Sequence, residues 1–99
     1  MKITVQSIHF DADRKLLEFI QEKVDKMVLF YDHIIGGEVF LKIEKSDEAK
    51  NKLVQIKLHI PGNDIIVSEQ CKTFEEATDL CIDTLSRQVK KHKERERGL

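Results

Sequence analysis

The stretch EVFLKIEKSDEAKNKLVQIKLHIPGNDIIVSEQ, residues 38–70, decides the fold, because apolar and polar side chains alternate along three separate runs of it. Runs 38–45, 52–60 and 65–70 place apolar residues at every second position, which is the period of a strand with one buried face. The polar segment after the first run and the Pro61–Gly62 pair after the second are both typical of turns. The stretch therefore predicts a three-stranded antiparallel meander.

The two faces of this meander have different compositions. The positions predicted to be buried are Val39, Leu41, Ile43, Val54, Ile56, Leu58 and Ile60. The other face is predicted to be open to solvent, and its polar set includes Lys42, Gln55, Lys57 and His59. A sheet with one apolar face needs a covering layer, which the flanking segments are expected to supply.

On the N-terminal side, residues 2–8 alternate as a further strand does, whereas residues 13–31 change to a helical period. The apolar stripe of that helix is Leu16, Ile20, Val24, Met27 and Tyr31. Asp11 or Asp13 is expected to cap its start, and the Gly36–Gly37 pair is expected to form its exit loop.

On the C-terminal side, a second helix is predicted to start at Thr73, because Thr73 and Glu76 have the spacing of a capping box. Its apolar stripe is Phe74, Ala77, Cys81, Leu85 and Val89. Cys71 and Cys81 lie ten residues apart, which matches neither a redox or zinc motif nor a disulfide scaffold. Both thiols are expected to be buried in the core.

These elements follow the order β-α-β-β-β-α and predict an α+β fold, in which a four-stranded sheet carries two helices packed on one face. A chain of 99 residues with 40% hydrophobic residues suits a single domain over residues 1–99. The helical crossover allows the first strand to pair in parallel with the second. No apolar run approaches the roughly 20 residues of a membrane helix, and the alternating start lacks a signal-peptide run, so a cytoplasmic protein is predicted.

Charge is distributed unevenly, although the formal net charge of the chain is only −1. Residues 1–86 contain 11 Lys and Arg against 16 Asp and Glu, whereas residues 87–97, the basic end of the second helix, contain six against two. One or two cations suffice to complement a helix C-terminus, so this excess favours a polyanionic partner, most commonly nucleic-acid phosphates.

The candidate phosphate-binding cations are Lys23 and Lys26 on the first helix and Arg87, Lys90, Lys91 and Lys93 on the second. With both helices on one side of the sheet, they are expected to form one electropositive surface. The aromatic residues are mostly assigned to core stripes. Recognition of phosphates and of the shape of an RNA helix is therefore predicted in place of base stacking. The predicted domain is similar in architecture to double-stranded-RNA-binding domains.

No arrangement typical of catalysis is found in the sequence. The four His residues are scattered without metal-ligand spacing, and no glycine-rich phosphate-binding motif occurs. Glu75, Glu76, Asp79 and Asp83 gather near the start of the second helix, where the helix dipole accounts for the first three. We predict a protein that is not an enzyme, with no catalytic residue, metal site or cofactor.

Three segments resemble one known family, and together they span essentially the whole chain. They are KITVQSIHF (2–10), FYDHIIGGEVFLKIEK (30–45) and TFEEATDLCIDTLSRQVKKHK (73–93), and the most specific piece is the pattern L-x-R-Q-x-x-K-H-K that ends the third. These segments resemble the bacterial ribosome hibernation-promoting factor and ribosome-associated inhibitor A family.

The resemblance implies a ribosome-binding domain that occupies the small-subunit channel between head and body, over ribosomal RNA where mRNA and the A- and P-site tRNAs sit. Binding of the 70S ribosome there inhibits translation and protects idle ribosomes in stationary phase or under stress. Residue by residue, the resemblance implies phosphate contact for Lys23, Lys26, Arg87, Lys91 and Lys93, with Lys90 adjacent.

The sequence departs from the family pattern at two points. Glu94 and Glu96 interrupt the basic run, so no phosphate contact is expected beyond Lys93. The sequence also ends at Leu99, as in short forms of the family, whereas long forms carry a C-terminal domain that dimerises ribosomes. The protein is expected to inactivate single ribosomes, or to join them together with a separate ribosome modulation factor.

A second interpretation, from a different class, is a non-catalytic protein-interaction or self-association module. Its binding surface would be the exposed sheet face or an edge strand. Such a module would bind as well at high salt as at low salt, whereas phosphate contacts weaken steeply as salt is added.

Overall fold

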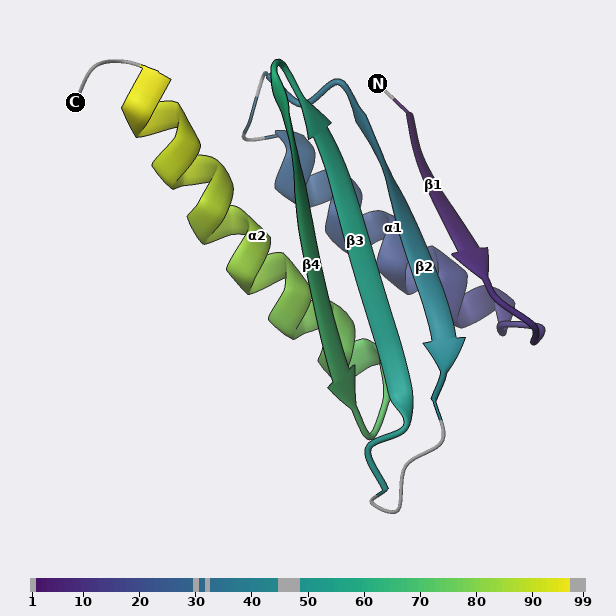
Figure 1. The fold of residues 1–99 in the computed structure, drawn as a ribbon. Coiled ribbons are helices and arrows are strands. Elements are labelled where there is room, and N and C mark those ends of the chain that lie inside the picture. The colour runs from purple at the N-terminus through teal and green to yellow at the C-terminus, as the bar shows by residue number, and fades with distance from the viewer. Residues whose placement is uncertain (1, 30, 32, 45–48, 97–99) are drawn as a thin grey trace.

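The computed structural model of the protein describes residues 2–29, 31, 33–44 and 49–96, with the side chains of all of these except Lys2 and residues 92–96. The elements are β1 (Lys2–Ser7), α1 (Arg14–Leu29), β2 (Gly36–Ile43), β3 (Lys52–Ile60), β4 (Asn63–Cys71) and α2 (Phe74–Glu96). Figure 1 shows the four strands in one sheet with both helices on the same side of it. The predicted order and the α+β class are confirmed.

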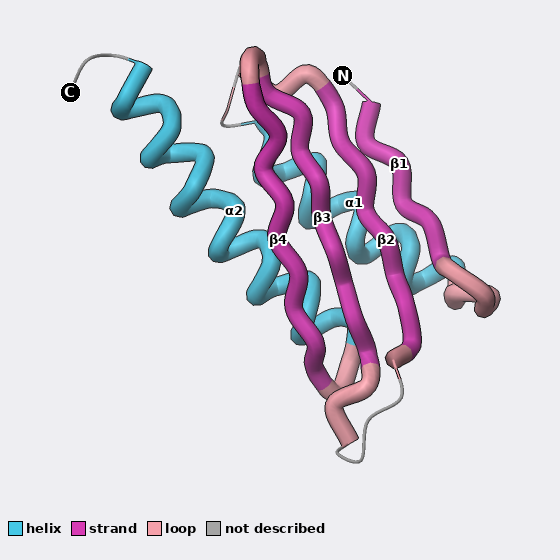
Figure 2. The backbone as a smooth tube through the Cα atoms, viewed as in Figure 1, coloured by secondary structure: helices cyan, strands magenta, loops and turns pink. Residues whose placement is uncertain are grey.

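The strands lie in the order β1-β2-β3-β4 (Figure 2). β1 pairs in parallel with β2, which the helical crossover allows, and the β2–β3 and β3–β4 pairs are antiparallel, as predicted for the meander. The β3–β4 turn consists of Pro61 and Gly62, and Gly62 has a φ of 79°. Pro before a glycine of positive φ is the pattern of a type II turn, which side chains other than glycine adopt at a cost.

The two helices run side by side in the same direction. Two contacts set their register: Lys23 of α1 reaches Asp79 of α2, and the Tyr31 hydroxyl, just beyond α1, donates a hydrogen bond to the Ser86 carbonyl oxygen at 3.3 Å. α1 also contacts β1, whereas α2 contacts β3 and β4. The helical layer therefore covers the whole width of one sheet face and leaves the other face open.

The core lies between the sheet and the helical layer. Its fully buried side chains include Ile20, Val24, Val39, Leu41, Val54, Ile56, Leu58, Cys81 and Leu85. Ile60 is 4% exposed and also belongs to the core, so the predicted alternating positions of the meander are buried with one exception. Ile43 is 46% exposed; it is the last residue of β2 and lies beyond Leu41, the last β2 residue that pairs with β1.

The starts of both helices are capped as the sequence predicted. The Glu76 backbone N–H donates to the Thr73 hydroxyl at 3.1 Å, and the Lys15 backbone N–H donates to the Asp13 carboxylate Oδ1 at 3.5 Å. Asp13, not Asp11, is therefore the N-cap of α1. Each cap satisfies N–H groups that have no partner inside the helix, which fixes where the helix begins.

The Gly36–Gly37 pair is not the exit loop that the sequence predicted, because both residues begin β2 and pair with β1 and β3. The strands approach closely at this point. A Cβ atom at Gly37 would lie 2.8 Å from the Lys57 carbonyl oxygen and 2.9 Å from Leu58 Cδ2. Gly37 therefore allows a close approach of neighbouring backbone, which explains a glycine inside a strand without any turn.

Candidate nucleic-acid interface

The predicted cations lie on the helices and not on the sheet. α1 carries Lys23 and Lys26, and α2 carries Arg87, Lys90 and Lys91. The backbone of Lys93 also belongs to α2, but its side chain lies outside the described residues. The side chains of Lys23, Lys26 and Arg87 are 44%, 70% and 72% exposed, so a large ligand can reach them from solvent.

Lys23 is the cation that joins the two helices. Its Nζ lies 3.9 Å from Asp79 Oδ1 on α2 and 5.4 Å from the centre of the Phe19 ring on its own helix. An ammonium over an aromatic face is attracted by the ring quadrupole, which holds the charge at the boundary between the helices. Lys23 therefore marks the line along which α1 and α2 meet at the surface.

Acidic side chains alternate with the cations. Lys26 Nζ lies 3.4 Å from Glu22 Oε1, and Arg87 Nη2 lies 3.0 Å from Asp83 Oδ2, each pair being one helical turn apart. All four side chains are more than two-thirds exposed, and exposed pairs of this kind contribute only about 0–1 kcal/mol. A polyanion with several phosphates can therefore replace these carboxylates as partners of the cations.

Arg87 and Lys91 lie together in a shallow hollow of about 370 Å³ on the outer flank of α2. The hollow is also lined by Thr84 and Gln88. A guanidinium, an ammonium, a hydroxyl and an amide supply charge and hydrogen-bond donors on one surface, which suits a phosphate oxygen. The structure thus brings two of the predicted cations, Arg87 and Lys91, onto one surface.

The hollow and Lys23 are separate places on the helical layer. At about 100° and 1.5 Å per residue, Arg87 lies about 80° around α2 and about 12 Å along it from Asp79, the partner of Lys23. By the same geometry Lys91 lies about 120° around the helix and about 18 Å along it. The cations are thus spaced along the outer side of the two helices, with Asp79 and Asp83 between them.

The sequence reasoning assigned Asp79 to the helix dipole and gave Asp83 no partner. Asp83 and Arg87 have the i, i+4 spacing of a helical ion pair, so this contact was open to prediction from the sequence alone. The Lys23–Asp79 contact could not be predicted in this way, because it depends on the position of α1 along α2. The helical layer is therefore less positive than a count of its Lys and Arg residues suggests.

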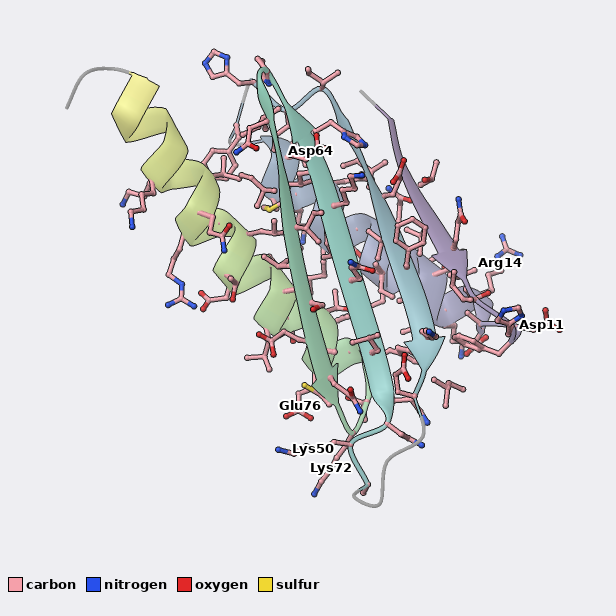
Figure 3. The ribbon with its side chains drawn as sticks, in the orientation of Figure 1. Asp11, Arg14, Lys50, Asp64, Lys72 and Glu76 are labelled. Atoms are coloured by element: carbon pink, nitrogen blue, oxygen red, sulfur yellow. The ribbon has the colours of Figure 1, made fainter. Side chains whose placement is uncertain are left out.

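The open face of the sheet carries a second charged cluster, at the end near the β3–β4 turn. His59 Nδ1 lies 2.9 Å from Asp64 Oδ1, and His59 Nε2 lies 3.6 Å from Glu38 Oε1. Lys57 Nζ lies 3.8 Å from Asp64 Oδ2. These four side chains are defined here as the His59 cluster, and Figure 3 labels Asp64 at this end of the sheet.

The carboxylates around His59 shift its pKa. The hydrogen bond with Asp64 is the largest cause and raises the pKa of His59 above 6.5, although partial desolvation opposes the shift. The same hydrogen bond lowers the pKa of Asp64 below 3.8, and Lys57 adds to this effect. Ion pairs of the His59 cluster connect β2, β3 and β4. The cluster lies on the opposite side of the sheet from the cations of the helices.

The thiols and the histidines form no reactive arrangement in the part of the chain that the structure describes. Cys71 and Cys81 are free and buried, as predicted, and burial raises the pKa of Cys81 to about 12. Among the described residues, no three His, Cys, Asp or Glu side chains are grouped to hold a metal ion. Nor does any described helix combine the length and apolar character that a membrane crossing requires.

The fold and this surface define a class of protein: a small α+β domain with two helices on one face of its sheet and cations spaced along those helices. The chain belongs to the family described as sigma 54 modulation protein / S30EA ribosomal protein, whose sequence profile matches residues 3–97. The family that the three sequence segments indicated is thereby confirmed.

Individual relatives match over nearly their whole length. The chain is 30% identical over 95 residues to a protein of Escherichia coli K12 named ribosome hibernation promoting factor, covering 96% of each chain. It is 28% identical over 99 residues to a Pseudomonas putida protein of the same name, covering all of this chain and 93% of the relative. Among solved structures, a ribosomal subunit interface protein from Coxiella burnetii has the same fold, with a TM-score of 0.81 at 22% identity over 94% of this chain and 98% of the other.

Proposed function

We propose that this protein is a ribosome hibernation factor, which binds the small ribosomal subunit and blocks translation by occupying the channel used by mRNA and tRNA. Membership of the family and relatives named ribosome hibernation promoting factor support this role. The observation that carries the proposed mode of binding is the hollow on α2, where Arg87 and Lys91 lie beside two hydrogen-bonding side chains. A ribosomal role also agrees with the cytoplasmic location predicted from the sequence.

In the proposed mechanism, ribosomal RNA phosphates displace carboxylates from the cations of the helical layer. Arg87 leaves Asp83, Lys26 leaves Glu22, and each cation gains a phosphate in place of an exposed carboxylate. Binding releases counterions from the RNA, so affinity depends strongly on salt. No bond is made or broken, and inhibition follows because the folded domain fills space that mRNA and tRNA need.

Co-sedimentation with purified small subunits tests this proposal. If about six phosphates are contacted, the logarithm of the affinity falls against the logarithm of the salt concentration with a slope on the order of −5. The double variant Arg87→Glu with Lys91→Glu is expected to lose binding at moderate salt, while its melting temperature stays close to that of the parent protein. Both side chains are exposed, so their replacement removes no core contact.

A matched control is Lys50→Glu with Lys72→Glu. This variant has the same change in net charge, and Figure 3 labels both lysines at the end of the molecule where α2 begins, away from the C-terminal turns of α2. It is expected to bind nearly as the parent protein does. Equal loss in the two double variants would show that only the net charge matters, and unchanged binding of the Arg87/Lys91 variant would refute the proposed surface.

The alternative is a self-association module, and two exposed isoleucines on the sheet give it some support. Ile66 is 53% exposed on the open face, and Ile43 is 46% exposed at the end of β2. Sedimentation of the protein without RNA separates the two functions, since a self-association module gains mass as its concentration rises at any salt. The same experiment on ribosomes, with and without a separate ribosome modulation factor, distinguishes inactivation of single ribosomes from joining of two.

A further inference from the structure

The open face of the sheet contains a hollow of about 280 Å³ that the helical surface does not explain. It is lined by Ile8, Phe40, Lys42, Leu53 and Gln55, which come from three neighbouring strands or their ends. The register accounts for its shape, because Phe40 lies directly opposite Gln55, and Lys42 lies directly opposite Leu53. Ile8 closes one side, since its N–H donates to the carbonyl of Leu41, next to Lys42.

The side chains of this hollow provide three kinds of contact in one small area. The half-buried Phe40 ring offers an aromatic surface in the middle of β2. Gln55 carries both a hydrogen-bond donor and an acceptor on its amide. The Lys42 ammonium is half-exposed at the rim and lies 3.1 Å from Glu44 Oε1. An apolar floor, one amide and one half-exposed cation are the groups that recognise a flat, polar, heteroaromatic ring attached to a phosphate.

We call this hollow the sheet hollow, and we propose that it binds one unpaired nucleobase of RNA. Phe40 packs against the ring of the base, Gln55 hydrogen-bonds its polar edge, and Lys42 binds the adjoining phosphate. The proposal rests on the proposed function in one respect, namely that RNA is the partner. It adds a second RNA contact on the opposite side of the sheet from the helical cations. A domain that sits inside an RNA-walled channel meets RNA on more than one side, and the two surfaces would then hold different segments.

Size and charge favour a nucleobase over other occupants. Pockets for drug-sized ligands are roughly 300–1,000 Å³, so a hollow of about 280 Å³ suits one ring system better than a folded segment of protein. An added peptide strand would pair with a sheet edge, whereas the sheet hollow lies on the face and includes residues of the inner strands β2 and β3. Lys42 gives the rim a cation, and its pair with Glu44 is an exposed one that a phosphate can displace.

Two RNA tetranucleotides test the proposal, added to the full, isotope-labelled chain and followed by NMR amide shifts. One is tetra-adenylate, and the other is its abasic counterpart, which has the same ribose-phosphate backbone but no bases. Tetra-adenylate is expected to shift the amide signals of Phe40 and Gln55 saturably. The abasic tetranucleotide is expected to leave those signals in place and to shift only signals near Arg87 and Lys91, because it retains charge but cannot stack.

Variants then assign the contact to particular side chains. Phe40→Leu keeps an apolar side chain on the sheet but loses the aromatic ring, and it is expected to weaken the tetra-adenylate effect at the sheet hollow about tenfold. Gln55→Glu replaces the amide donor by a charge that repels RNA, and it is expected to weaken the effect as well. Ile66 lies on the same face of the sheet but outside the hollow. Ile66→Leu is therefore the matched control, and it is expected to leave the tetra-adenylate effect unchanged.

Three results would overturn the base-binding site. Equal shifts of Phe40 and Gln55 with both tetranucleotides would show that phosphate alone is bound there. Unshifted signals with tetra-adenylate would show that the hollow takes no base. Shifts that grow with protein concentration in the absence of RNA would show that a second copy of the chain covers it.

The outcomes separate this proposal from the proposed function. Full ribosome binding by Phe40→Leu and Gln55→Glu, together with loss of binding by the Arg87/Lys91 double variant, would overturn the base contact and leave the hibernation role standing. Saturable base binding by a protein that fails to sediment with small subunits would support the sheet hollow and overturn the ribosomal role.

Discussion

The two faces of the sheet differ in what they require of the sequence. The covered face is apolar and tightly packed, with Val39, Leu41, Val54, Ile56 and Leu58 fully buried beneath the helices. The open face mixes charged, amide and apolar side chains, most of them half-buried or exposed. Packing therefore determines which residues the covered face can accept, whereas the open face and the outer side of the helices are free to carry binding groups.

The comparison separates stability from recognition within one small domain. Neither the cations on the outer side of the helices nor the side chains of the open face contribute to the buried core. A substitution on the covered face is thus expected to change the free energy of unfolding strongly, and a substitution on the other two surfaces is expected to change binding, with at most a small effect on stability. Three predictions test this separation, beginning with the one of largest effect.

Two isoleucines on neighbouring strands provide the most direct test. Ile56 of β3 is fully buried, and Ile66 of β4 is 53% exposed on the open face. Ile56→Ala is expected to lower the free energy of unfolding by about 2–5 kcal/mol, because it removes buried methyl groups and leaves a cavity. Ile66→Ala is expected to lower it by less than about 1 kcal/mol. Urea denaturation of both variants and the parent protein measures the difference.

Both variants replace isoleucine by alanine, so a difference between them reports the position of the side chain and not its identity. If Ile66→Ala proved as destabilising as Ile56→Ala, the open face would be covered in solution, most simply by a second copy of the chain. The distinction between the two faces would then fail. A concentration-dependent melting temperature would accompany that result.

The covered face is also the part of the molecule that the sequence predicted best. Period-two alternation in residues 38–70 and the three-four spacing of the helices specify which side chains face the core, and burial forces both patterns. Thr73 and Asp13 are local signals, since a cap needs only the residues beside it. Elements set by local pattern and by burial were therefore predicted correctly.

Three details that depend on distant segments were not predicted, because nothing local specifies them. A Gly36–Gly37 pair is typical of a turn. Only the packing of β2 between β1 and β3 shows that the absence of a Cβ atom at Gly37 makes room for the Lys57 carbonyl. The Lys23–Asp79 contact likewise depends on the relative position of two helices. Ile43 was assigned to the core because alternation within β2 does not reveal that β1 pairs only as far as Leu41.

The acidic side chains on the helical layer provide the second prediction. Asp83→Asn removes the carboxylate 3.0 Å from Arg87 and leaves the cation available to phosphate. Affinity for small subunits is expected to rise about two- to fivefold at low salt, which corresponds to roughly 0.5–1 kcal/mol for an exposed pair. Co-sedimentation across a salt series measures the change, and the gain should shrink as salt increases.

Asp11→Asn is the matched control for the change in net charge. Asp11 is exposed in the segment between β1 and α1, and Figure 3 labels it on the side of the molecule away from the C-terminal end of α2. It is expected to leave the affinity nearly unchanged. Equal gains from the two variants would mean that net charge alone sets the affinity, and a loss of affinity with Asp83→Asn would mean that Asp83 positions Arg87 for binding.

The smallest expected effect concerns pH and the His59 cluster on the open face. The pKa of His59 is raised above 6.5 in the folded protein, so its contribution to stability is fully present below pH 6.5 and is lost as pH rises through the folded pKa. The pKa of Asp64 is lowered below 3.8, so its contribution is present above pH 3.8 and is lost as pH falls through the folded pKa. Both contributions coexist between pH 3.8 and 6.5.

His59→Gln is therefore expected to lower the free energy of unfolding more at mildly acidic pH than at mildly alkaline pH, where a smaller fraction of His59 in the parent protein is protonated. The carboxylates of Glu38 and Asp64 lose a positive partner in this variant, whereas Lys57 still faces Asp64. Urea denaturation at the two pH values measures the change. His33→Gln, an exposed histidine outside the cluster, is the control. Because the cluster is solvent-accessible, the effect on the free energy of unfolding should be small. Identical pH profiles for His59→Gln and the parent protein would show that these charges on the open face do not contribute to stability.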